Sequence, residues 1–296
     1  MISPERFVQF ARWALWSLTA IVITGASVRL TGSGLGCSDW PNCEEDQFVA
    51  SLEYHAMIEF VNRLVTGVVA AAVILAVLGS LRRVPKRRDL VRWSLGLVAG
   101  VVAQVILGAL LVKTELDPRF TMGHFLLSMV LLWNAVVLLE KAKHDEPRAG
   151  PPPQLRIWTR LVFASVAVLL VTGTVVTGSG PHSGSDEPEV AARLPFLVRE
   201  VTRVHSVTAI IVLAVVLWTV RRAHCDAAFE RRQDVMRVMS LLVVQGAVGY
   251  WQYFTGVPVL LVGFHITLAS LTWIQVVRLA WQSEQPVPVE REMVRT

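Results

Sequence analysis

Long apolar runs separated by short polar segments dominate this chain. Each run is close to the ~20 residues that a helix needs to cross a hydrocarbon layer about 30 Å thick. Backbone groups in lipid must bond to one another, so each run is predicted to be a helix. The expected fold class is an all-α integral membrane protein with eight transmembrane helices. The predicted spans are residues 9–30, 57–80, 93–113, 121–140, 158–178, 200–220, 238–256 and 260–281.

Composition agrees with this pattern, because 53% of the 296 residues are hydrophobic and only 17% are charged. The first run is too long for a signal-peptide core and lacks an A-x-A cleavage site, so it is kept as a helix.

The net charge of +5 reports topology rather than nucleic-acid binding, because Lys and Arg are grouped in alternate loops. By the positive-inside rule, both termini and the loops rich in Lys and Arg face the cytoplasm of a bacterial cell membrane. These basic loops are 81–92, 141–157 and 221–237, and the loops expected outside are 32–54, 114–120 and 179–199.

The chain reads as two similar halves. A Pro-rich stretch at 144–156 is interpreted as a cytoplasmic linker between domains at 1–143 and 157–296. The motif TGSG closes both the first and the fifth span. Gln104 and His124 recur as Gln245 and His265 at one offset of 141. A parallel repeat of two pseudo-symmetric four-helix bundles is therefore expected.

Three histidines, His124, His205 and His265, lie at one depth near the outward ends of the even-numbered spans. A pair of imidazoles on facing helices suits haem iron, and His205 with His265 would form such a pair in the second half. The alternative is that each histidine only bonds neighbouring helices. In the first half Asn62 stands where the repeat calls for the mate of His124. His55 could be that ligand only if the second helix starts early.

The stretch "IEFVNR" places Glu59, Asn62 and Arg63 at the mouth of an apolar run. Charge inside a span costs roughly 2.5 kcal/mol or more per group, which suggests a function. The alternative is that Glu59 and Arg63, four residues apart, merely neutralise each other. Cys37 and Cys43 flank a Trp-Pro turn in the first outer loop. They are expected to form a disulfide, with a redox or substrate-handling role as the alternative.

With the loop "GCSDWPNC", the stretch "IEFVNR" and the loop "TGSGPHSG", the chain resembles the haem A synthase family over nearly all of residues 10–282. The resemblance implies oxidation of a methyl group of haem O to the formyl of haem A for cytochrome oxidase. It implies a cofactor haem b between His205 and His265, and a substrate haem in the first half, where Glu59 is critical. The family's usual pattern is Glu-x-x-His-Arg, and Asn62 replaces its histidine here.

An iron with only His124 as strong ligand keeps one position open, which suits a haem that enters, reacts and leaves. Arg63 is then a counter-charge for Glu59 or a propionate ligand. Expected partners are haem O, a haem O synthase, an electron donor and membrane lipid, but no nucleic acid. Two other readings are a dihaem electron-transfer or quinol-oxidising protein, and a repeat-built transporter with Glu59 as its coupling carboxylate.

Overall fold

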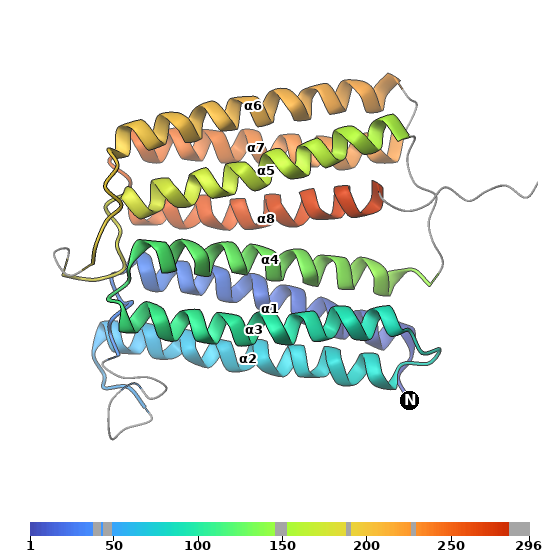
Figure 1. The fold of residues 1–296 in the computed structure, drawn as a ribbon, viewed down its shortest axis with the longest axis horizontal. Coiled ribbons are helices and arrows are strands. Elements are labelled where there is room, and N and C mark those ends of the chain that lie inside the picture. The colour runs from blue at the N-terminus through green and yellow to red at the C-terminus, as the bar shows by residue number, and fades with distance from the viewer. Residues whose placement is uncertain (38–42, 44–48, 146–152, 188–190, 226–228, 284–296) are drawn as a thin grey trace, which may run out of the picture.

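The structure is a computed structural model that describes residues 1–37, 43, 49–145, 153–187, 191–225 and 229–283 (Figure 1). The described part consists of long helices and has no strand beyond two isolated bridges. The helices are α1 Pro4–Leu30, α2 Tyr54–Arg82, α3 Arg88–Lys113, α4 Pro118–Lys143, α5 Pro153–Ser179, α6 Val198–Cys225, α7 Phe229–Phe254 and α8 Val259–Ser283. The predicted all-α class is confirmed.

Local chemistry explains where α1 and α4 begin. Ser3 caps α1 by accepting a bond from the Arg6 amide at 3.4 Å, and Pro4 follows in the first turn. Asp117 caps α4 by accepting from the Arg119 amide at 2.8 Å, again with a proline directly after it. A short polar cap followed by proline is a common helix start, because it satisfies an amide that has no partner within the helix.

Seven of the helices in the described residues are long and apolar enough to cross a membrane, so the chain is a multi-pass membrane protein. The exception is α7, for which the sequence predicts a span over 238–256. This helix ends at Phe254 and is less apolar than the other seven. Polar side chains along it, such as Gln233, Asp234 and Gln252, account for the shortfall. It nevertheless packs against α6 and α8, beside which it lies in Figure 1.

The helices form two groups of four, α1–α4 and α5–α8, which run side by side in Figure 1. The groups meet through α1, α4, α5 and α8. Trp273 of α8 donates from its indole nitrogen to the Met129 carbonyl of α4 at 2.8 Å, and Glu140 of α4 pairs with Arg278 of α8 at 3.2 Å. These contacts make the two groups one packed unit.

Odd-numbered helices start, and even-numbered helices end, at the same end of the molecule (Figure 1). Arg87 ties that end together, because it pairs with Asp89 at 2.7 Å and donates to the His144 carbonyl at 2.7 Å. Arg83 is buried and pairs with Asp145. These bonds join the loops at that end of the molecule.

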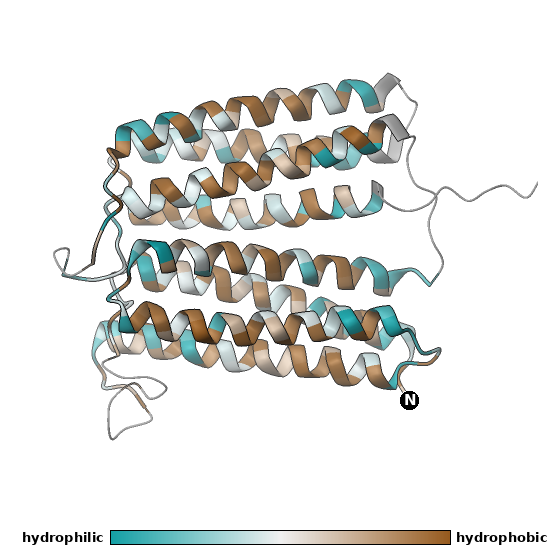
Figure 2. Ribbon diagram, in the orientation of Figure 1, coloured by the Kyte–Doolittle hydropathy of each residue, from teal (hydrophilic) through white to brown (hydrophobic). Residues whose placement is uncertain are grey.

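Figure 2 shows apolar residues along the middles of the helices and polar ones gathered toward their ends. Many large apolar side chains face outward, including Leu64, Val68, Val102 and Leu217. Such a surface needs lipid around it. At the junction of the halves, α5 begins at Pro153, so the last residues assigned to the linker 144–156 are helical. Residues 146–152 of that linker lie outside the described part.

Candidate functional site

His205 and His265 face each other inside the second bundle. Their ring centres are 6.5 Å apart and the ring planes are inclined by 71°. His205 lies seven residues after the start of α6 and His265 six after the start of α8, so both sit about two turns in from the same end. The predicted pair on facing helices is therefore brought together.

Small residues make room for both rings. A Cβ added at Gly173 would lie 3.1 Å from Cε1 of His205, and one added at Gly249 would lie 3.1 Å from Cε1 of His265. The Thr172 hydroxyl bonds Nδ1 of His205 at 2.9 Å and fixes that ring. Nδ1 of His265 is buried and has no hydrogen-bond partner in the described part of the chain.

The first bundle repeats half of this arrangement. The Gln104 side-chain amide donates to the His124 carbonyl at 3.1 Å, and Gln245 donates to the His265 carbonyl at 2.9 Å. Nδ1 of His124 is likewise buried and, among the described residues, without a hydrogen-bond partner. The repeat inferred from the 141-residue offset is thus visible as the same bond made twice.

Asn62 takes the place that His205 has in the second bundle. Thr24 on α1 donates to Oδ1 of Asn62 at 2.8 Å, just as Thr172 on α5 bonds His205. Both threonines directly precede a glycine. His55 does lie in α2, because the helix starts at Tyr54, but its Nδ1 bonds the Ser33 hydroxyl at 3.0 Å and its ring packs edge-on against Tyr54. Its ring is thus committed to other partners.

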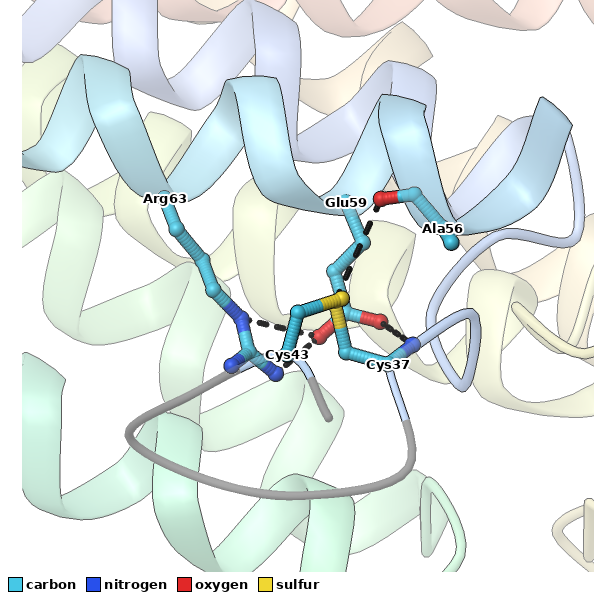
Figure 3. The surroundings of a disulfide bond; sticks show 5 residues. All are labelled: Cys37, Cys43, Ala56, Glu59 and Arg63. Atoms are coloured by element: carbon cyan, nitrogen blue, oxygen red, sulfur yellow. Dashed lines mark hydrogen bonds and ion pairs between the residues drawn. A yellow bond between two sulfur atoms is a disulfide. The ribbon is translucent and has the colours of Figure 1, made fainter. Parts of the chain in front are cut away.

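Glu59 is buried with 6% of its surface exposed, and both carboxylate oxygens have partners. Arg63 donates to Oε1 from Nε at 3.2 Å and from Nη2 at 2.5 Å, so the ion pair weighed from the sequence is present. The Cys37 amide donates to Oε2 at 2.9 Å. Figure 3 shows the carboxylate between the Arg63 guanidinium and the Cys37 amide. The pattern of sequence gave no hint of the bond from Cys37.

Cys37 and Cys43 form a disulfide, as predicted, with Cα atoms 4.5 Å apart. Both cysteines are buried in one cluster with Ala50 and Ala56, so the disulfide packs against the start of α2 (Figure 3). Residues 38–42, which hold the Trp-Pro turn, lie outside the described part. The disulfide therefore sets where the Cys37 amide meets Glu59.

Arg29 is a polar residue of this end that the sequence reasoning missed. It lies in the last turn of α1 and bonds carbonyls of the other bundle, the Thr177 carbonyl at 2.9 Å and the His182 carbonyl at 3.0 Å. A lone guanidinium inside an apolar run was the available signal, and it is the same signal that identified Glu59.

The geometry of His205 and His265 fits a haem. Metal–imidazole bonds are about 2 Å long, so two rings on opposite sides of one iron have centres about 6 Å apart. The described residues contain no cluster of three or more His, Cys, Asp or Glu side chains able to hold a metal ion. Two protein ligands suffice for a porphyrin iron, because the ring supplies the other ligands.

Residues 10–277 match the family of cytochrome oxidase assembly proteins (COX15-CtaA). The chain belongs to this family. A "heme A synthase" of Lysinibacillus sphaericus is 27% identical over 64% of this chain and 62% of its own length. One from Halalkalibacterium halodurans is 24% identical over 86% of this chain and 87% of its own length.

Coverage of the relatives is uneven. The chain spans 62% of the Lysinibacillus relative and 59% of a "heme A synthase" of Exiguobacterium sibiricum. A "protoheme IX farnesyltransferase" of Thermus thermophilus is 34% identical over 33% of this chain and 16% of its own length. Membership in the assembly family therefore rests on the match over residues 10–277. The relatives are similar proteins whose names refer to haem.

Proposed function

We propose that this protein is a haem A synthase, which oxidises one methyl group of haem O to the formyl group of haem A. Membership in the family and the names of its relatives support this activity. The observation that carries it is the difference between two repeat-related sites. One bundle presents His205 opposite His265, and the other presents Asn62 where a second histidine would stand.

The second bundle is proposed to hold a resident haem b. His205 and His265 are its axial ligands, the Thr172 hydroxyl orients the His205 ring, and Gly173 and Gly249 leave space beside the imidazoles. When bound there, haem b would supply one-electron transfer. The surrounding helices keep that site rigid and out of water.

The first bundle is proposed to receive haem O. His124 is its single strong axial ligand, because the Asn62 amide binds iron poorly and is already bonded to Thr24. One coordination position stays open for chemistry. This arrangement also lets the substrate enter and the product leave.

Glu59 is proposed as the catalytic carboxylate beside the methyl group. The reaction replaces two C–H bonds of that carbon by one C=O bond, a four-electron oxidation for which dioxygen is the proposed oxidant and oxygen source, its other oxygen atoms leaving as water with electrons from the external donor. A fixed carboxylate can accept a proton or stabilise positive charge that develops at that carbon. Arg63 forms an ion pair with the buried Glu59, and the Cys37 amide fixes the orientation of the carboxylate. Arg63 is also close enough to the site to serve as a propionate ligand.

The setting follows from the proposed reaction. We place the chain in a bacterial cell membrane with both termini in the cytoplasm, since the basic loops gather at that end. The likeness to a farnesyltransferase acting on protohaem supports a haem O synthase as the partner that supplies the substrate. The remaining partner is a donor of electrons to the second bundle.

Extraction of the porphyrins from the purified protein tests this proposal. Haem b together with haem O, haem A or a hydroxylated intermediate is the expected result. In His205→Ala and His265→Ala variants, the low-spin spectrum should change while the first-half haem remains. Haem b alone, filling both halves, would instead make the chain a dihaem electron carrier. A purified protein with no Soret absorption would favour the transporter and end the proposal.

A further inference from the structure

Arg29 reaches out of its own bundle into the end of the other. Its Nε donates to the His182 carbonyl at 3.0 Å and its Nη2 to the Thr177 carbonyl at 2.9 Å. Thr177 lies in the last turn of α5, so a first-half side chain covers the outer end of the second bundle. The neighbouring Leu30 lies against α8, where a Cβ at Gly263 would be 3.6 Å from its Cδ1. Gly263 precedes His265 by two residues.

A second guanidinium, that of Arg193, bonds the same stretch of loop after α5. Its Nη2 donates to the Pro181 carbonyl at 2.6 Å, one residue before His182. Arg193 is near enough to repel Arg29, and burial lowers the pKa of Arg193 itself. In the described part of the chain, no carboxylate lies within ion-pair distance of either side chain, although Asp186 and Glu187 belong to the same loop. Within that part, both guanidiniums donate to neutral carbonyls.

Two half-buried cations beside each other are costly without an anion. Carbonyl oxygens satisfy some of their N–H groups but cancel no charge. Each guanidinium can donate more hydrogen bonds than it makes here, and its planar fork matches a carboxylate or a phosphate. The pair therefore has the chemistry of a site for a ligand with two negative charges.

The depth of this pair relates it to the two imidazoles. Along α5, Thr172 bonds His205, and Thr177, which accepts from Arg29, follows five residues later. Five residues of helix rise about 7.5 Å. The Arg29 guanidinium thus lies about one and a half turns beyond the imidazole pair, toward the polar end of the bundle, and Arg193 bonds the loop that follows α5. A porphyrin likewise has its iron at the centre and both propionates on one edge.

We propose that Arg29 and Arg193 bind the two propionate carboxylates of the porphyrin whose iron is held by His205 and His265. The inference rests on the proposed function, since it requires a haem in the second bundle. It adds that the first bundle helps to hold the cofactor of the second through Arg29. Two cations facing two carboxylates leave the site neutral.

Transfer of haem from the purified protein to excess apomyoglobin tests this site. In Arg29→Gln and in Arg193→Gln, haem b should leave roughly tenfold faster or more, because each change removes a charged hydrogen bond to the ligand. The absorption spectrum should stay low-spin, because both imidazoles remain. Arg119→Gln is the matched control, since Arg119 is an exposed arginine at the same end of the molecule and, among the described residues, pairs only with Asp117. It should release haem at the normal rate.

Haem with both propionates esterified gives a second readout, and its comparison in the wild-type protein does not depend on whether any variant folds. The wild-type protein should bind the diester roughly tenfold more weakly than haem, and the double variant Arg29→Gln, Arg193→Gln should lose that preference. Equal binding of haem and diester by the wild type would overturn the inference. So would normal haem release in both single variants, or loss of bound phospholipid instead of haem, which would assign the site to a lipid phosphate.

Failure of this inference differs from failure of the proposed function. If the wild-type protein carries haem b that His205→Ala disturbs, while the arginine variants behave as Arg119→Gln does, only the propionate site is wrong. If the wild type binds no haem and none can be loaded, the proposed function itself is wrong.

Discussion

Glu59 accepts hydrogen bonds from Nε and Nη2 of Arg63 and from the Cys37 amide. A buried carboxylate with both oxygens paired is stable as an anion and fixed in direction. This arrangement serves a catalytic base, and it would also serve a purely structural ion pair. The two roles differ in what the neutral amide of glutamine would do at this position.

We expect Glu59→Gln to fold, to keep haem b, and to convert haem O at least about a hundredfold more slowly, because the amide cannot accept a proton. Some hydroxylated intermediate should accumulate if the oxidation has two stages. Product ratios from extracted porphyrins measure this, with haem b content taken from the spectrum. Arg63→Gln is the control that breaks the same ion pair but keeps the carboxylate. Normal turnover of the fully loaded Glu59→Gln protein would reduce Glu59 to a structural role.

Asn62 offers a test at one residue of why the two halves differ. A histidine at position 62 would find Thr24 placed as Thr172 is for His205, and a Cβ added at Gly25 would meet nothing within 4 Å, so there is room beside it. With added haem O, Asn62→His should give a low-spin six-coordinate spectrum and slower turnover. Asn62→Gln keeps an amide and should leave the spectrum as it was. A high-spin spectrum in Asn62→His would show that this position does not face the iron.

Single residues were predictable from the sequence where they stood out chemically. Glu59, Arg63 and the histidines are polar groups in apolar runs, so their cost in lipid points to them directly. Arg29 carries the same signal just before the TGSG motif, but the repeat gives it no polar counterpart, because Val175 stands at the matching position. The bonds from Cys37 to Glu59 and from Thr24 to Asn62 depend on how a loop and a helix pack, which spacing along the chain does not encode.

At the scale of elements, the loop between α1 and α2 is bonded both to itself and to the start of α2. The Cys37–Cys43 disulfide closes it on itself, and the Cys37 amide bonds Glu59 (Figure 3). The Ser33 hydroxyl adds a bond to His55 in the first turn of α2. The position of Glu59 thus depends on the loop as well as on its own helix.

We expect the thiols of Cys37 and Cys43 to be unreactive toward alkylating reagents in native membranes, and the unreduced protein to be lighter by two hydrogens than the reduced one. Replacing both cysteines by serine should lower the thermal midpoint, because closing so short a loop constrains the unfolded chain by about 2 kcal/mol. The single variant Cys43→Ser serves as a control that frees one thiol. Alkylation at both cysteines in untreated membranes would refute the disulfide.

Helix positions were predictable because a membrane imposes one length and one composition on every span. Helix α7 forms over the predicted span but is less apolar than the others. Its apolar content is lower because it carries Gln245, whose amide bonds the His265 carbonyl, and further polar residues toward both ends. Helix α7 packs in the bundle and also makes a polar contact with α8, so its apolar content alone does not reveal its position.

The whole molecule is a duplicated bundle in which the copies have diverged at the site. The repeat keeps the bonds from Gln104 and Gln245 to the two histidine carbonyls, and it keeps a threonine beside Asn62 and His205. It does not keep the histidine, because Asn62 stands in the first half where His205 stands in the second. Nor does it keep the arginine, because Val175 stands before the second TGSG motif where Arg29 stands before the first. Spacing alone revealed the duplication, whereas contacts between the bundles needed the fold.

The most direct test of the account is to incubate the purified protein with haem O, dioxygen and a reductant, and to identify the porphyrins extracted afterwards. Haem A should appear with the wild-type protein and stay near background with Glu59→Gln. Extraction of haem O unchanged from wild-type protein that carries its full haem b would contradict the proposed synthase.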